Sequence, residues 1–209
     1  MTSTKIGIIG AGMIGATAAR LFVDAGHDVA VSNSRGPASL APLVKELGPK
    51  AHAMSVAEAA RWADVVLLAV PWRSPDALPP ADAVDGKIVI DAMNPYGKDG
   101  TVLDLGASTS SEETRKRLPG ARLVKAFNTI WFKHLASRGR ADLPIDERHA
   151  IFVAGDDAPA KAVVMKLIEE IGFGPVDTGP LVEGGRRQQP NTPVYNKVLT
   201  VREGKALVG

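Results

Sequence analysis

Short apolar runs alternate along this chain with longer segments in which apolar positions recur every three or four residues. The runs are typical of strands buried on both faces of a sheet, and the segments are typical of helices with one buried face. The expected strands are 5–9, 28–31, 51–53, 65–70, 87–91, 122–125, 149–154 and 175–177. The expected helices are 13–25, 37–47, one that begins at 55, 111–118, 130–136, 157–171 and 195–207. This alternation predicts an α/β fold, a Rossmann-type doubly wound and mainly parallel sheet with a small C-terminal extension.

Composition excludes several classes of protein. The formal net charge is +2 and charges of both signs are mixed along the chain, so a nucleic-acid partner is not expected. Because the chain has no cysteine, disulfides, thiolate metal sites and thiol catalysis are all excluded. The polar start at 1–5 is followed by only a short apolar run, and no window is long enough for a spanning helix. We therefore expect a cytoplasmic protein that does not bind a membrane.

A glycine-rich turn between the first strand and the first helix matches the pattern G-x-G-x-x-G. Its residues are Gly10, Ala11, Gly12, Met13, Ile14 and Gly15. Between a strand and a helix, such glycines allow a tight turn, a close backbone approach to a pyrophosphate and close packing of the helix on the strand. The amides and the dipole at the helix N-terminus then favour an anion. The turn therefore predicts a dinucleotide-binding site.

The end of the second strand indicates which dinucleotide is bound. In NAD-binding proteins an acidic residue about 20 positions after the glycines holds the ribose hydroxyls. Here that place holds Asn33, Ser34 and Arg35, without a carboxylate. A guanidinium beside small hydroxyl and amide groups suits a 2′-phosphate. The sequence therefore predicts an NADP(H)-binding domain over 1–179 and an extension over 180–209 that packs on this domain or on a partner subunit.

Three further segments follow strands whose carboxyl ends should border the ligand. They contain Val70, Pro71 and Trp72 after one strand, Asn94 after the next, and Asn128 after the one that follows. Each segment alone is also consistent with an ordinary turn. Together they are expected to surround the nicotinamide, with apolar faces against the ring and asparagine amides toward the carboxamide or the ribose.

These segments together resemble the family of NADPH-dependent reductases of the deazaflavin coenzyme F420. The resemblance also includes 91–95, 125–129 and 155–157, and it spans nearly the whole chain. It implies direct hydride exchange between NADPH and the deazaflavin, and the leading hypothesis is an NADPH-dependent reductase that passes hydride to a deazaflavin, a flavin or a similar ring. It also implies that 11–14 hold the pyrophosphate, that 33–35 hold the 2′-phosphate and that Val70 and Pro71 border the nicotinamide. Because members of the family pair, a homodimer is expected.

No residue is assigned a catalytic role from the sequence. The four histidines lack the spacing of metal ligands, so no metal is expected. His134, Tyr96 and Tyr195 are candidate proton donors, although hydride transfer between two bound rings needs orientation and exclusion of water more than an acid. The glycine- and arginine-rich segment 184–190 is expected to form a surface turn, with a mobile flap over an anionic acceptor as the alternative.

Two other functions remain open. One is an NADPH-dependent reductase of a small carbonyl or imine, which would need a dimer to complete its site because few residues follow Gly179. The other is a sensor or interaction protein that binds NADP(H) without turnover. Dinucleotide binding combined with background NADPH oxidation for every acceptor would identify the sensor.

Overall fold

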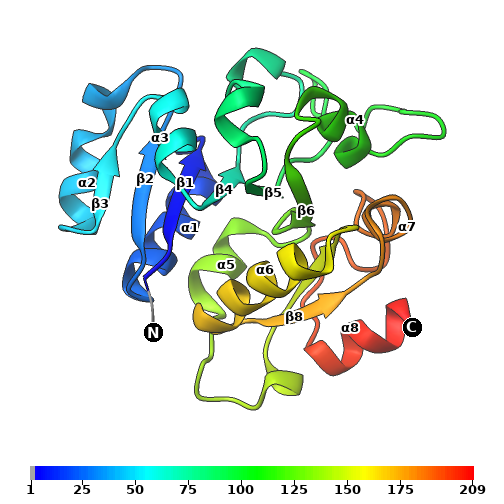
Figure 1. The fold of residues 1–209 in the computed structure, drawn as a ribbon. Helices are drawn as coiled ribbons and strands as arrows, with labels where there is room; N and C mark the ends of the chain where they lie inside the picture. Colours follow the sequence, from blue (N-terminus) through cyan, green and yellow to red (C-terminus); the bar gives the residue numbers. More distant parts are fainter. Residues whose placement is uncertain (1–2) are drawn as a thin grey trace.

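The computed structural model describes residues 3–209, so the first two residues of the polar start lie outside the described part. It forms an eight-stranded sheet with helices on both faces (Figure 1). The strands are β1 (Lys5–Ile9), β2 (Asp28–Ser32), β3 (Ala51–Ala53), β4 (Val65–Leu68), β5 (Ile88–Asp91), β6 (Arg122–Ala126), β7 (Ala150–Ala154) and β8 (Gly174–Asp177). The α-helices are α1 (Met13–Asp24), α2 (Ala41–Leu47), α3 (Val56–Trp62), α4 (Ser110–Arg117), α5 (Phe132–Ser137), α6 (Ala158–Glu170), α7 (Leu181–Arg187) and α8 (Val201–Val208). Short 3₁₀ helices are η1 (Pro37–Leu40), η2 (Pro75–Ala77), η3 (Ala81–Val84) and η4 (Ile145–Glu147).

The strand order is β3-β2-β1-β4-β5-β6-β7-β8. The strands β1 to β6 are parallel to one another, β7 is antiparallel to β6, and β8 is parallel to β7. The sheet grows outward from β1 to β3 and then resumes on the other side of β1 with β4. In open α/β sheets, ligands bind beside the carboxyl ends of the strands at such a switch point. The predicted doubly wound, mainly parallel α/β fold is confirmed.

Both faces of the sheet are buried, which explains why the strands are continuous apolar runs rather than alternating ones. In β1, the successive residues Ile8 and Ile9 are both fully buried but belong to different cores. The core on one side is closed by α1, α2, α5 and α6, which contribute residues such as Phe22 and Leu167. The core on the other side is closed by α3, η3 and α7, which contribute Ala59, Val84 and Leu181.

The segment 184–190 is not the surface turn that the sequence predicts. Residues Leu181–Arg187 form α7, and the structure buries Gly184 and Gly185 in it. A Cβ at Gly184 would lie 2.8 Å from the Cβ of Ala154, so the missing side chain lets α7 lie directly on β7. The low helix propensity of glycine predicts a turn, but tertiary packing against β7 outweighs that propensity here.

The last helix, α8, begins six residues later than expected, at Val201. Its start is fixed by a capping box, in which the Thr200 side chain accepts a hydrogen bond from the Glu203 amide and the Glu203 carboxylate accepts one from the Thr200 amide. Val201 packs with Phe152 and Val176. Figure 1 accordingly shows α8, in red, beside β8. The extension over 180–209 thus contacts the sheet of its own chain, while the division into domains at residue 179 stays a prediction.

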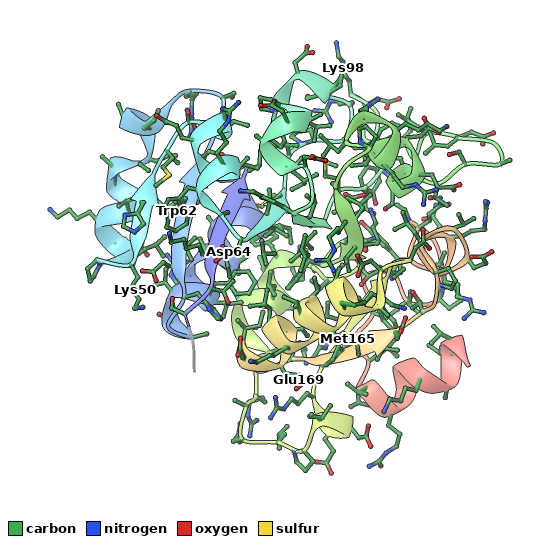
Figure 2. All side chains as sticks on the ribbon, viewed as in Figure 1. Lys50, Trp62, Asp64, Lys98, Met165 and Glu169 are labelled. Carbon is green, nitrogen blue, oxygen red and sulfur yellow. The ribbon has the colours of Figure 1, made fainter. Side chains whose placement is uncertain are left out.

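The segments that precede the parallel strands lie at one end of the sheet, and the segments that follow them lie at the other. Lys50 and Asp64 directly precede β3 and β4, whereas Lys98 lies in the loop after β5. Figure 2 shows Lys50 and Asp64 at one end of the sheet and Lys98 at the other. The segments that follow the parallel strands therefore gather at the Lys98 end. No helix within residues 3–209 has both the length and the apolar character needed to cross a membrane.

Candidate functional site

Two cavities lie at the carboxyl ends of the strands and meet at the glycine-rich turn. We call one the aromatic cavity, which has a volume of about 470 Å³, and the other the β2 cavity, which has a volume of about 600 Å³. Both are within the usual size range of ligand sites. The residues that line both cavities are Gly12, Ala69, Val70 and Pro71. An elongated ligand that crosses this turn would occupy both cavities.

The three glycines of the turn have different structural roles. Gly10 has φ +105°, and a Cβ there would lie 2.5 Å from the carbonyl oxygen of Ala69. A Cβ at Gly15 would lie 1.8 Å from the carbonyl oxygen of Gly10, so α1 packs on the turn only without a side chain. A Cβ at Gly12 would meet no atom within 4 Å. The fold therefore requires the first and third glycines, whereas the second leaves open space at the junction of the cavities.

The N-terminus of α1 faces this open space. Gly12 is the N-cap residue, no side chain caps the helix, and its first turn holds no acidic residue. The first amides of a helix have no partner within the helix, and together with the helix dipole they favour an anion. Met13, which follows Gly12, is 65% exposed and lines the aromatic cavity. This combination of uncapped amides and free space fits a pyrophosphate.

Asn33 and Ser34, which follow β2, line the β2 cavity. The Asn33 carboxamide holds the turn, because its Oδ1 accepts a hydrogen bond from the Arg35 amide at 2.9 Å and its Nδ2 donates one to the Ser39 hydroxyl at 2.9 Å. The Arg35 side chain is exposed and is not among the residues that line the β2 cavity. Within residues 3–209 it forms no ion pair. Its guanidinium is therefore available to a ligand at the rim.

The aromatic cavity concentrates most of the aromatic side chains of the protein. The chain has three Trp, two Tyr and five Phe residues. Six of these ten line the cavity, namely Trp72, Tyr96, Phe127, Trp131, Phe132 and Tyr195. Trp131 is 42% exposed, which is unusual for so large an apolar side chain. Aromatic faces offer large flat contact areas, so the lining suits planar ring systems.

Two asparagines connect the walls of the aromatic cavity. Asn94 Nδ2 donates a hydrogen bond to the Asn128 carbonyl at 2.8 Å, and Asn128 Nδ2 donates to Asn94 Oδ1 at 3.1 Å and to the Gln188 carbonyl at 2.8 Å. Asn128 is 3% exposed, and its Oδ1 has no hydrogen-bond partner. Phe127, which precedes it, has φ +65° although it is fully buried. A bulky residue with this backbone is a conformational outlier of the kind that concentrates at functional sites.

A buried ion pair lies at the ends of β5 and β6, where these walls begin. Lys125 Nζ lies 3.3 Å from Asp91 Oδ2, and the two side chains are 1% and 0% exposed. The Lys125 ammonium also donates to the Met93 carbonyl, and the Ser111 hydroxyl donates to Asp91 at 2.8 Å. Burial lowers the pKa of Lys125, and the charge of Asp91 opposes that shift. The pair ties the end of β5 to the end of β6, from which the Asn94 and Asn128 segments leave.

Trp72 lines the aromatic cavity, but its polar group is already occupied. The indole Nε1 donates a hydrogen bond to the Ser110 carbonyl at 3.1 Å, and the Arg117 guanidinium lies 5.3 Å from the centre of the ring. Only 9% of the residue is exposed. Trp72 therefore offers an apolar surface to the cavity and no hydrogen bond.

His134 is not part of the lining of the aromatic cavity, but its ring packs against Trp131, which is. Its ring centre lies 5.2 Å from that of Trp131 and 5.9 Å from that of His149. Burial lowers the pKa of His149 to about 4, with the nearby His134 as a second cause, so His149 is neutral near neutral pH. In the part of the chain that the structure describes, no group of three or more His, Asp and Glu side chains could hold a metal ion.

The family model described as NADP oxidoreductase coenzyme F420-dependent matches residues 5–95. The crystal structure of the hypothetical protein SMa0349 from Sinorhizobium meliloti is 36% identical, covers 96% of both chains and superimposes with a TM-score of 0.82. A structure from Arthrobacter sp. FB24, described as a "putative f420 dependent nadp-reductase", is 28% identical and covers 95% of this chain and 100% of its own, with a TM-score of 0.76. This chain belongs to the F420-dependent NADP oxidoreductase family.

Family membership confirms the resemblance drawn from the glycine turn and the strand ends. The matched residues 5–95 contain the glycine turn, the end of β2 and the wall at Val70, Pro71 and Asn94. A further relative, the Escherichia coli protein YjhV, is 48% identical over 48 residues, which are 23% of this chain and 34% of YjhV. The chain therefore spans about a third of that curated relative.

Proposed function

We propose that this protein is an oxidoreductase that binds NADP(H) across the two cavities and passes hydride between the nicotinamide and a planar ring acceptor. The acceptor is the deazaflavin coenzyme F420, a flavin or a similar ring. One observation carries the proposal, namely that a cavity lined by six aromatic side chains opens directly onto the uncapped N-terminus of α1. Membership of an NADP oxidoreductase family supports the same assignment.

The residues present fit the dinucleotide. Ala11, Gly12, Met13 and Ile14, flanked by Gly10 and Gly15, would hold the pyrophosphate in the space that a side chain at position 12 would fill. Asn33, Ser34 and Arg35 would hold the adenosine ribose and its 2′-phosphate. Val70, Pro71 and Trp72 would contact the nicotinamide, whose carboxamide could pair with Asn94 or with the free Oδ1 of Asn128.

When bound, NADPH supplies the hydride, and the protein orients the two rings and excludes water. The buried Asp91 and Lys125 pair fixes the strand ends that carry Asn94 and Asn128. The aromatic side chains limit how a flat acceptor can lie against the nicotinamide. None of these contributions requires a metal or a nucleophilic side chain.

The first test is NADPH oxidation by the purified protein, followed by absorbance, with oxidised coenzyme F420, free flavins, small carbonyls and small imines as acceptors. We expect turnover with the deazaflavin or a flavin and background rates with the carbonyls and imines. NADPH binding without turnover for any acceptor would overturn the proposal in favour of a sensor.

A reductase of a small carbonyl or imine is the second candidate. It is favoured by the tyrosine pair in the aromatic cavity, where the Tyr96 hydroxyl donates a hydrogen bond to the Tyr195 hydroxyl at 2.9 Å. Such a reduction needs a proton donor as well as a hydride, and a phenol can serve. Turnover with a carbonyl or an imine, and not with the ring acceptors, would establish this alternative.

Arg35 supplies a test of the cofactor assignment. We expect Arg35→Ala to weaken NADP⁺ binding roughly tenfold to a hundredfold, because a hydrogen bond to a charged group contributes about 1.5–3 kcal/mol. NAD⁺ binding should stay nearly unchanged, since NAD⁺ lacks the 2′-phosphate. Isothermal titration of both dinucleotides measures the difference. Arg202→Ala, on the exposed side of α8, is the control and should change neither affinity. Equal loss for the two dinucleotides would contradict the assignment.

A further inference from the structure

Two tyrosine hydroxyls meet inside the aromatic cavity. Tyr96 comes from the loop after β5 and Tyr195 from the turn before α8, and their Oη atoms are 2.9 Å apart. Both side chains line the cavity and are half-buried. They are the two tyrosines of the chain. Packing of the C-terminal segment against the strand ends is what brings them together.

The hydrogen bonds around Tyr195 leave its own proton unused. Its oxygen accepts a hydrogen bond from the Tyr96 hydroxyl and a longer one, at 3.4 Å, from Asn94 Nδ2. A phenol has one O–H donor, and within residues 3–209 no acceptor is bonded to that of Tyr195. Hydrogen bonds received by a hydroxyl polarise it and strengthen the bond that it donates. The Tyr195 O–H is thus available to a molecule in the cavity.

The position of Tyr195 is fixed by its neighbours. The Asn196 amide donates to the Thr129 carbonyl at 2.8 Å, which links this turn to the segment after β6. Asn196 has φ +53°, a conformation that asparagine tolerates better than most residues. Burial raises the pKa of the Tyr195 phenol, so the proton stays in place under neutral conditions. Tyr195 therefore presents a fixed, protonated donor.

We propose that Tyr195 donates a hydrogen bond to a carbonyl oxygen of the acceptor, and that the site selects planar rings whose carbonyl is conjugated to the ring atom that receives the hydride. This inference rests on the proposed ring-acceptor function. In that reaction a C–H bond of the reduced nicotinamide breaks and the hydride forms a new bond to the acceptor ring, at a carbon in a deazaflavin and at a nitrogen in a flavin. The ring π electrons move toward the carbonyl oxygen, where the Tyr195 hydrogen bond stabilises the charge until a proton from solvent is taken up. NADPH is oxidised and the ring is reduced.

The test compares two tricyclic ligands that differ in carbonyl content. Lumiflavin carries ring carbonyls, whereas phenazine has none. Each is titrated into the full chain saturated with NADP⁺, and quenching of tryptophan fluorescence reports binding because Trp72 and Trp131 line the cavity. We expect Tyr195→Phe to weaken lumiflavin about tenfold, the effect of one lost hydrogen bond, and to leave phenazine unchanged. With coenzyme F420, kcat should fall while the KM for NADPH stays the same.

Tyr96→Phe is the matched control, because it removes a hydroxyl from the same cavity but not the proposed donor. It should weaken lumiflavin less than Tyr195→Phe does. Equal losses for lumiflavin and phenazine in Tyr195→Phe, or no loss for lumiflavin, would overturn the Tyr195 assignment alone. If the wild type binds NADP⁺ but neither tricyclic ligand, and no ring acceptor oxidises NADPH, the ring-acceptor function itself fails and the inference fails with it.

Discussion

Asp91→Ala should lower the free energy of unfolding by about 3–5 kcal/mol, because it leaves the ammonium of Lys125 buried without its counter-charge. The hydrogen bonds that Asp91 accepts from the Ser111 hydroxyl, at 2.8 Å, and from the Met93 amide, at 2.9 Å, are lost as well. Since total stabilities of single domains are about 5–15 kcal/mol, the variant should unfold at a much lower urea concentration. Urea titration followed by circular dichroism measures the change.

Two further variants distinguish an ion-pair effect from simple loss of packing. Asp91→Leu combined with Lys125→Met replaces both charges by apolar groups, and such replacements of buried pairs are often neutral, so most of the lost stability should return. Asp82→Ala removes the ion pair between Asp82 and Arg61, whose side chains are 71% and 55% exposed respectively. It should lower the free energy of unfolding by less than about 1 kcal/mol. If Asp91→Ala were no worse than Asp82→Ala, the pair would not hold the strand ends together.

The charges of this pair are visible in the sequence, but their burial is not. Asp91 and Lys125 each interrupt an apolar run near the end of a strand, where a charge normally marks the point at which the strand leaves the core. In the structure they are paired residues of neighbouring parallel strands, both buried, and their hydrogen-bond partners are Met93 and the first residues of α4, Ser110 and Ser111. The opposite charges at equivalent strand ends were the available signal. Their burial depends on how the loops fold back, which periodicity does not encode.

The glycine turn, by contrast, was predictable because its causes are local. A strand, three glycines at fixed spacing and an apolar helix face are all contiguous in sequence, and the structure places β1, the turn and α1 there. Tyr195 lines the aromatic cavity from the C-terminal segment, 99 residues from its partner Tyr96. Gln188 of the same segment accepts a hydrogen bond from Asn128, 60 residues away. Contacts over such separations depend on tertiary packing, as does the helix α7 built around two glycines.

Gly12→Val should weaken NADPH binding more than about a hundredfold, equivalent to about 3 kcal/mol, while the protein stays folded. A Cβ at position 12 would meet no atom within 4 Å, and the backbone there, with φ −79° and ψ −165°, is extended and open to any residue. Valine would instead fill the space where the two cavities join and where the pyrophosphate would approach the α1 amides. Titration with NADPH, followed by its fluorescence, together with thermal unfolding separates the two effects.

The neighbouring glycines give the contrast that makes this result specific. Gly15→Ala should unfold the domain or lower its melting temperature sharply, since its Cβ would lie 1.8 Å from the Gly10 carbonyl oxygen. Gly185→Ala in α7 places a Cβ 3.8 Å from the Thr109 hydroxyl, an ordinary contact, and should leave NADPH affinity unchanged. If Gly12→Val bound NADPH normally, the dinucleotide would not cross the turn between the cavities. If its affinity loss were matched by a loss of melting temperature as large as that of Gly15→Ala, position 12 would serve the fold rather than the ligand.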